Sequence, residues 1–129
     1  IDQVMLYNNQ SPYTIALIVP NKDNLKRKLA HKDLTLDSEE GRKYALKKLE
    51  KELNKYKKGG DFEGMFPERW LPSTFAVLPE PFTEQNQMIN STMKMVRGKI
   101  EKAYAQRINF LYTPEGKQIF NQENLDCIK

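Results

Sequence analysis

The chain has 129 residues, of which 39% are hydrophobic and 29% are charged. These proportions are typical of a globular protein with one small core. The longest apolar run, Ile15 to Val19, is too short to cross a bilayer. A single cysteine, Cys127, excludes an internal disulfide, and a single histidine, His31, leaves too few ligands for a structural zinc site. We therefore expect a soluble, cytoplasmic protein without a structural metal.

Two strands and a short helix are predicted at the start of the chain. Residues Gln3–Tyr7 and Tyr13–Val19 are rich in Val, Ile, Leu and Tyr, and turn-forming residues join them. Asn21 then caps a helix that carries Leu25 and Leu29 on one face. Because the first residue is not Met and already lies in a strand pattern, we expect the chain to be part of a longer protein.

A long amphipathic helix is predicted next. Asp37 and Glu40 have the spacing of a capping box, and Gly59-Gly60 supplies a stop. The apolar stripe of this helix comprises Ala45, Leu46, Leu49, Leu53 and Tyr56. One face is therefore buried, and the lysines lie mostly on the others.

The positive charge of the chain is concentrated around this helix. Between Lys22 and Lys58 thirteen Lys or Arg residues stand against seven Asp or Glu residues, whereas the net charge of the whole chain is +4. Two interpretations remain open. The charges form a solvated helix face, or they meet phosphates of coenzyme A, an anionic membrane or nucleic acid.

The second half of the chain predicts one more strand and further helices. Phe75–Leu78 is a strand ended by prolines, and Trp70 before it is predicted to pack at the core edge. An apolar stripe at Ile100, Tyr104, Ile108 and Leu111 predicts a helix. Thr113-Pro114-Glu115 predicts the start of a last short helix. The order of elements predicts one α+β domain over residues 1–129. It contains a small, mostly antiparallel three-stranded sheet packed with helices and a long basic helical insertion.

Lys94 is the candidate functional residue. It follows a loop and directly precedes the helix at Arg97, where an ammonium close to backbone N–H groups can meet a carboxylate or a phosphate. A lysine at this position is also typical of a solvated surface. Arg97 either lines the same side as Lys94 or forms a salt bridge with Glu101.

The sequence segments around Lys94 resemble the C-terminal end of long-chain fatty acid-CoA ligases. These enzymes are members of the adenylate-forming (AMP-binding) superfamily. The resemblance rests on Trp70-Leu71-Pro72, Phe75–Leu78, Glu80-Pro81-Phe82-Thr83, Ser91-Thr92-Met93-Lys94 and Arg97. In that family a lysine in a Thr-Pro-Thr-x-Lys or Ser-Gly-Lys context holds the substrate carboxylate and the α-phosphate. The resemblance gives this role to Lys94 and places Thr92 and Arg97 near substrate or phosphate. Asn90-Ser91-Thr92 departs from Thr-Pro-Thr, so the turn lacks a stiffening proline.

The resemblance implies the mobile C-terminal lid of a two-domain ligase. Its partners would be its own N-terminal adenylation domain, which holds ATP, Mg²⁺ and the fatty acid, and coenzyme A. The lid supplies Lys94 for acyl-adenylate formation and then rotates for thioester formation. By itself it would be inactive, because the sequence contains no glycine-rich phosphate loop and no Ser-His-Asp set.

Peripheral membrane contact is a further expectation, and no nucleic-acid partner is expected. The alternatives are a basic α+β module that binds nucleic acid or protein, or the lid of another adenylating enzyme. Steep salt dependence of nucleic-acid binding would favour the basic module.

Overall fold

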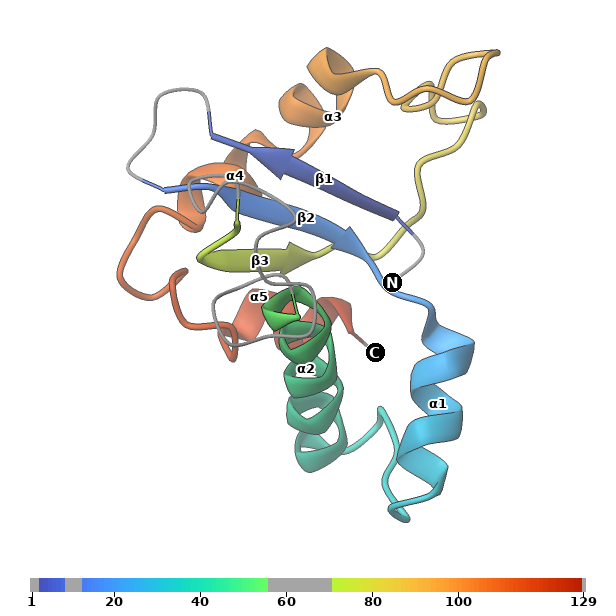
Figure 1. Cartoon of the computed structure of the whole chain (residues 1–129), viewed down its shortest axis with the longest axis vertical. Helices are drawn as coiled ribbons and strands as arrows, with labels where there is room; N and C mark the ends of the chain where they lie inside the picture. Colours follow the sequence, from blue (N-terminus) through green and yellow to red (C-terminus); the bar gives the residue numbers. More distant parts are fainter. Residues whose placement is uncertain (1–2, 9–12, 56–70, 129) are drawn as a thin grey trace.

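The computed structural model describes residues 3–8, 13–55 and 71–128. A three-stranded sheet lies between two groups of helices, with α1, α2 and α5 toward one face and α3 and α4 toward the other (Figure 1). The elements are β1 (Gln3–Tyr7), β2 (Ile15–Val19), α1 (Lys22–Ala30), α2 (Glu39–Asn54), β3 (Thr74–Val77), α3 (Arg97–Ala103), α4 (Ala105–Phe110) and α5 (Gln122–Cys127). This arrangement confirms the α+β class.

The sheet is mixed, with strand order β1-β2-β3. β1 pairs antiparallel with β2, and Gln3 lies opposite Val19. β3 pairs parallel with β2, and Ile15 lies opposite Thr74. The predicted antiparallel arrangement therefore holds for one of the two pairings. The third strand runs parallel because the chain returns through α1 and α2 to the end of the sheet at which β2 began.

Both faces of the central strand are buried. Ala16 and Ile18 join a core with α1, α2 and α5, whereas Ile15, Leu17 and Val19 join a second core with α3 and α4. All five residues of β2 are buried, as their continuous apolar run requires. The sheet thus separates two cores, and each helical group is held by its own core.

The first two helices begin at polar caps. The Oδ1 of Asn21 accepts a hydrogen bond of 3.0 Å from the Asn24 N–H, as the sequence predicted. α2 is capped by Ser38 and not by Asp37: the Ser38 Oγ accepts a 3.0 Å hydrogen bond from the Gly41 N–H. The predicted helix stop at Gly59-Gly60 and the predicted packing of Trp70 lie outside the described residues.

The C-terminal region differs from the single helix that the apolar stripe predicted. At Tyr104 the backbone leaves helical geometry (φ −112°, ψ 24°), and this separates α3 from α4.

The phenol of Tyr104 has a raised pKa. Burial is the larger cause and the Glu80 carboxylate the second, and together they raise this pKa above its ordinary value of 10.0. Tyr104 therefore remains neutral at physiological pH.

The end of the chain also differs from prediction. Thr113 opens turns and not a helix: its Oγ accepts a hydrogen bond of 3.0 Å from the Gly116 N–H. The last helix is α5, capped by Asn121, in a polar stretch for which the sequence predicted no structure. In the part of the chain that the structure describes, none of the helices is long and apolar enough to span a membrane.

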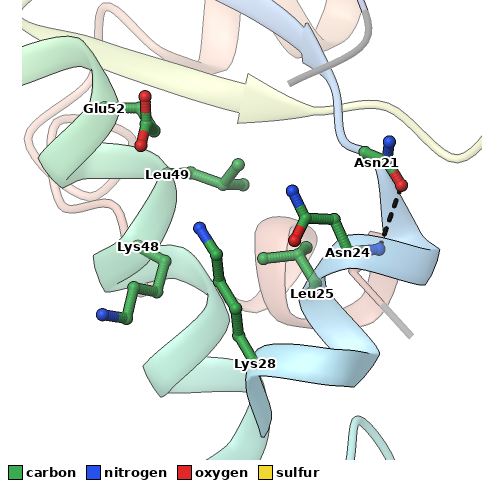
Figure 2. Close-up of a pocket in the computed structure, with 7 residues that line it drawn as sticks. All are labelled: Asn21, Asn24, Leu25, Lys28, Lys48, Leu49 and Glu52. Atoms are coloured by element: carbon green, nitrogen blue, oxygen red, sulfur yellow. Dashed lines mark hydrogen bonds between the residues drawn. The ribbon is translucent and has the colours of Figure 1, made fainter.

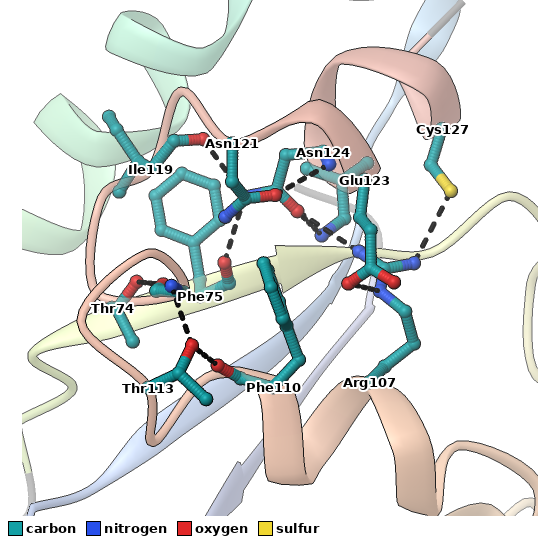
Figure 3. A network of polar contacts seen from close by, with 12 residues as sticks. Thr74, Phe75, Arg107, Phe110, Thr113, Ile119, Asn121, Glu123, Asn124 and Cys127 are labelled. Carbon is teal, nitrogen blue, oxygen red and sulfur yellow. Dashed lines mark hydrogen bonds and ion pairs between the residues drawn. The ribbon is translucent and has the colours of Figure 1, made fainter.

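A buried polar network fastens α5 to the sheet (Figure 3). The Asn124 side chain is fully buried, and its Oδ1 accepts hydrogen bonds from the Val77 N–H (2.9 Å) and from Arg107 Nη2 (3.0 Å). Its Nδ2 donates to the main-chain oxygens of Phe75 and Ile119, each at 3.0 Å. This network joins β3, α4 and α5.

Candidate functional site

Lys94 lies on a tight hairpin between β3 and α3. Ile89 and Met95 form an antiparallel bridge across it. The Asn90 N–H donates to the Lys94 carbonyl at 2.9 Å, and the Met93 N–H donates to the Asn90 carbonyl at 2.9 Å. Met93 has φ 63°, the left-handed conformation expected at the third position of a three-residue hairpin loop. Lys94 is therefore the first residue after the turn.

The base of this hairpin is anchored to the sheet. Phe82 and Ile89 are buried in the core beside α3 and α4. The carboxamide of Gln3 in β1 bonds both main-chain groups of Phe82: Oε1 accepts at 2.7 Å and Nε2 donates at 3.1 Å. Thr83 and Asn86 are joined by two hydrogen bonds. The Thr83 N–H donates to the Asn86 Oδ1 at 3.0 Å, and the Asn86 N–H donates to the Thr83 Oγ1 at 3.1 Å. The segment that leads into the hairpin is thus held against the sheet by packing and by hydrogen bonds.

The ammonium of Lys94 is exposed, and it has no hydrogen bond or ion pair to the described residues. α3 begins only at Arg97 and has no side-chain cap, so the amine is carried by the hairpin and not by the first turn of a helix. Thr92 is also exposed, and its hydroxyl donates to the Asn90 Oδ1 at 2.8 Å. The braced turn thus presents an ammonium that is unpaired with respect to the described residues.

Arg97 bonds a partner that neither interpretation of the sequence included. Its Nη2 donates to the main-chain oxygen of Leu6 in β1, with no ion pair to Glu101 among the described residues. β1 is an edge strand, so this carbonyl is available on its outer side. Arg97 therefore attaches the start of α3 to the sheet.

The described residues form no cluster of three or more His, Cys, Asp or Glu side chains that could hold a metal ion. The buried network around Asn124 and Arg107, which sequence reasoning missed, connects secondary-structure elements, and its hydrogen bonds do not involve Lys94. The sequence gives little sign of this network, because Asn124 is a polar residue that becomes buried only when α5 packs on the sheet.

The basic charges gather on α1 and α2. A hollow of about 160 Å³ lies between these helices (Figure 2). Lys28 points into it beside the Asn24 carboxamide, whereas the ammonium of Lys48 points away and lies 5.2 Å from the centre of the Tyr44 ring. Two other lysines are paired: Lys43 of α2 lies 3.6 Å from Glu39, and Lys55, the C-cap of α2, lies 3.1 Å from Glu52.

Lys94 and the basic helices do not form a common site. The hairpin projects beyond α3 at one end of the molecule, and α1 and α2 occupy the other end (Figure 1). Any ligand that met both would have to span the sheet. Within the described residues, the Lys94 hairpin and the basic face of α1 and α2 are therefore separate positively charged regions.

Comparison with known proteins gives one informative likeness. Neither the protein-family models nor the curated proteins match this chain. Among solved structures, the chain is similar to the adenylation domain of a carboxylate reductase from Mycobacterium chelonae, with a TM-score of 0.54 and 23% sequence identity. The alignment covers 87% of this chain and 15% of that one. At this identity the likeness establishes the fold, and the chain spans only a small part of the other protein.

Proposed function

We propose that this chain is the mobile C-terminal domain of an adenylate-forming enzyme, specifically a long-chain fatty acid-CoA ligase, and that Lys94 is the lysine that it brings to the active site. The observation that carries the proposal is the exposed Lys94 ammonium, which has no partner among the described residues and sits on a hairpin anchored to the sheet. An unpaired cation held in this way is available to an external anion.

Two further observations support this proposal. The sequence segments around Lys94 resemble those of the ligase family, and the similar solved structure is named as an adenylation domain. The described residues form no cluster of His, Cys, Asp or Glu side chains that could hold Mg²⁺. We therefore assign binding of ATP, Mg²⁺ and fatty acid to a separate N-terminal domain.

In the proposed reaction Lys94 acts on developing charge. A fatty acid carboxylate oxygen bonds to the α-phosphorus of ATP while the bond to pyrophosphate breaks, and the Lys94 ammonium stabilises the negative charge of both groups. Electrostatic stabilisation of this kind is commonly a large part of catalysis. Rotation of the domain then withdraws Lys94 before coenzyme A forms the thioester. A modest, polar interface between domains permits such a hinge motion.

The decisive experiment is ATP-pyrophosphate exchange with a long-chain fatty acid in the full-length protein. We expect Lys94→Ala to reduce exchange by at least about 100-fold, the scale of losing one group that stabilises transition-state charge. Conversion of supplied acyl-adenylate to thioester should remain near the unmodified rate, because Lys94 is withdrawn in that step.

The matched control is Lys102→Ala, which removes an exposed lysine of α3. This variant should retain both half-reactions. Equal losses in the two half-reactions of Lys94→Ala would contradict the role assigned to Lys94. Unaffected exchange would instead favour a binding function for the basic helices. Exchange with other carboxylic acids but not fatty acids would indicate a different adenylating enzyme.

We also propose that the basic face of α1 and α2 meets phosphate groups, either of coenzyme A or of an anionic membrane. Exposed Lys47 and Lys51 stand one turn apart on α2, and neither is in an ion pair with the described residues. Their separation from Lys94 is compatible with use in a different pose of the domain.

A further inference from the structure

The turn that carries Lys94 is organised by one side chain, that of Asn90. Its Oδ1 accepts hydrogen bonds from the Thr92 N–H (3.0 Å), the Thr92 hydroxyl (2.8 Å) and the Lys94 N–H (3.0 Å). The Asn90 main chain also bonds Lys94 and Met93. The Asn90 carboxamide oxygen therefore bonds both Thr92, the second residue of the loop, and Lys94, the first residue after it.

This turn needs such a brace for two reasons. First, Ser91 occupies the position at which a proline would fix the backbone φ angle, so the sequence leaves the turn conformationally free. Second, Met93 adopts φ 63°, which is unfavourable for a residue with a side chain. Met93 is 71% exposed, so packing does little to compensate.

The direction of the Lys94 side chain depends on this turn. The Lys94 N–H is fixed by the Asn90 Oδ1, and the Lys94 carbonyl is fixed by the Asn90 N–H. With both main-chain groups held, the Cα–Cβ bond of Lys94 points in one direction relative to the sheet. Without the carboxamide, the Lys94 N–H and the Thr92 N–H lose these partners. The exit of the turn is then held by main-chain bonds such as that from the Asn90 N–H to the Lys94 carbonyl, so its restraint is weaker.

We propose that Asn90 is the positioning residue for Lys94, and that its carboxamide oxygen does here what a proline at position 91 would do. This inference rests on the proposed function of Lys94. Asn90 touches no substrate; it acts through the orientation of the lysine. The effect should therefore fall on the adenylation rate and not on substrate affinity.

The test uses three variants of the full-length protein. Asn90→Ala removes the acceptor and should lower kcat for adenylation about 10- to 100-fold, the scale of a misplaced reacting group, with little change in KM. Asn90→Ala combined with Ser91→Pro should recover most of this loss, because proline is favoured at the second position of such turns. Proline would remove the Ser91 N–H, which donates no hydrogen bond to the described residues. Asn109→Ala, at an exposed position of α4, is the control and should retain the full rate.

The outcomes separate this inference from the proposed function. If Lys94→Ala abolishes exchange but Asn90→Ala keeps the full rate, Asn90 has no positioning role. If proline fails to restore the rate in a variant that unfolds at the normal temperature, the brace is not conformational and the inference is wrong. Equal loss of thioester formation in Asn90→Ala would also overturn it. Full exchange in Lys94→Ala would instead overturn the proposed function.

Discussion

Gly41 shows how a single residue permits a local structure. It lies in the first turn of α2, where a Cβ atom would stand 1.8 Å from the Thr35 carbonyl oxygen and 3.0 Å from the Ser38 Oγ. Glycine in a helix ordinarily costs about 0.5–1 kcal/mol relative to alanine. Here the missing Cβ lets the preceding loop pass close to the helix, so glycine is required.

We expect Gly41→Ala to lower the free energy of unfolding by about 1–3 kcal/mol, because the backbone of Thr35 must move. Gly98 is the matched control: an added Cβ at this position in α3 would meet nothing within 4 Å. Gly98→Ala should therefore raise stability by about 0.5–1 kcal/mol. Urea denaturation followed by circular dichroism measures both changes. Changes of the same sign in the two variants would contradict the argument.

Individual residues were predictable where their role depends on near neighbours. The cap at Asn21 followed from the sequence, and its Oδ1 does bond the Asn24 N–H. The choice between Asp37 and Ser38 as the next cap did not, because both are good capping residues and their local patterns overlap. The hydrogen bonds of Asn90 to Thr92 and Lys94 were missed although they are local, because the sequence did not reveal that residues 90–94 form a tight turn.

At the scale of elements, Asn124 completes the exposed side of an edge strand. β3 ends the sheet, so Phe75 and Val77 have main-chain groups that no neighbouring strand can bond. The Asn124 carboxamide bonds one group of each, and this fully buried side chain thereby substitutes for a fourth strand. α5 is fixed to the sheet through these bonds.

We expect Asn124→Ala to destabilise the chain by about 3–5 kcal/mol, because it leaves several buried main-chain groups without partners. Hydrogen exchange of the Val77 amide should accelerate more than that of the amides of β2. Asn109→Ala, which shortens an exposed asparagine, should change stability by less than about 0.5 kcal/mol. Protection of Val77 that survives in Asn124→Ala would show that another group replaces the carboxamide.

Elements were predictable where their hydrophobic periodicity is strong. β1, β2 and α1 lie close to their predicted ranges, although β2 begins two residues after the predicted start at Tyr13. The stripe from Ile100 to Leu111 did not reveal the break at Tyr104, since the apolar spacing continues across it. α5 was missed because its buried face includes Asn124, a residue that pattern analysis treats as polar surface.

At the scale of the molecule, the separation of the two basic regions leads to a test of the basic face. Replacing Lys47, Lys48 and Lys51 with Glu should raise the KM for coenzyme A if the face meets its phosphates. The same change should reduce partitioning onto vesicles containing phosphatidylserine if the face meets a membrane. Both effects should weaken with added salt.

The control for this test reverses Lys99 and Lys102 on α3, at the other end of the molecule. This variant should change neither the KM for coenzyme A nor vesicle partitioning. A variant of α2 that leaves both quantities unchanged would remove the proposed role and identify the lysines as a solvated helix face. The sequence showed which segment carries this positive charge, but its separation in space from Lys94 could be seen only in the fold.

The mixed sheet has a consequence for the order in which the protein can form. β2 meets β1 across a short connection, but its other partner, β3, is separated from it in sequence by α1, α2 and residues 56–70. During synthesis on the ribosome, Ile15–Val19 therefore emerges well before Thr74–Val77 exists to cover its second edge. Closing such a long connection is entropically costly and slow. Until β3 arrives, this fully apolar strand keeps an open edge at which aggregation or chaperone binding can occur.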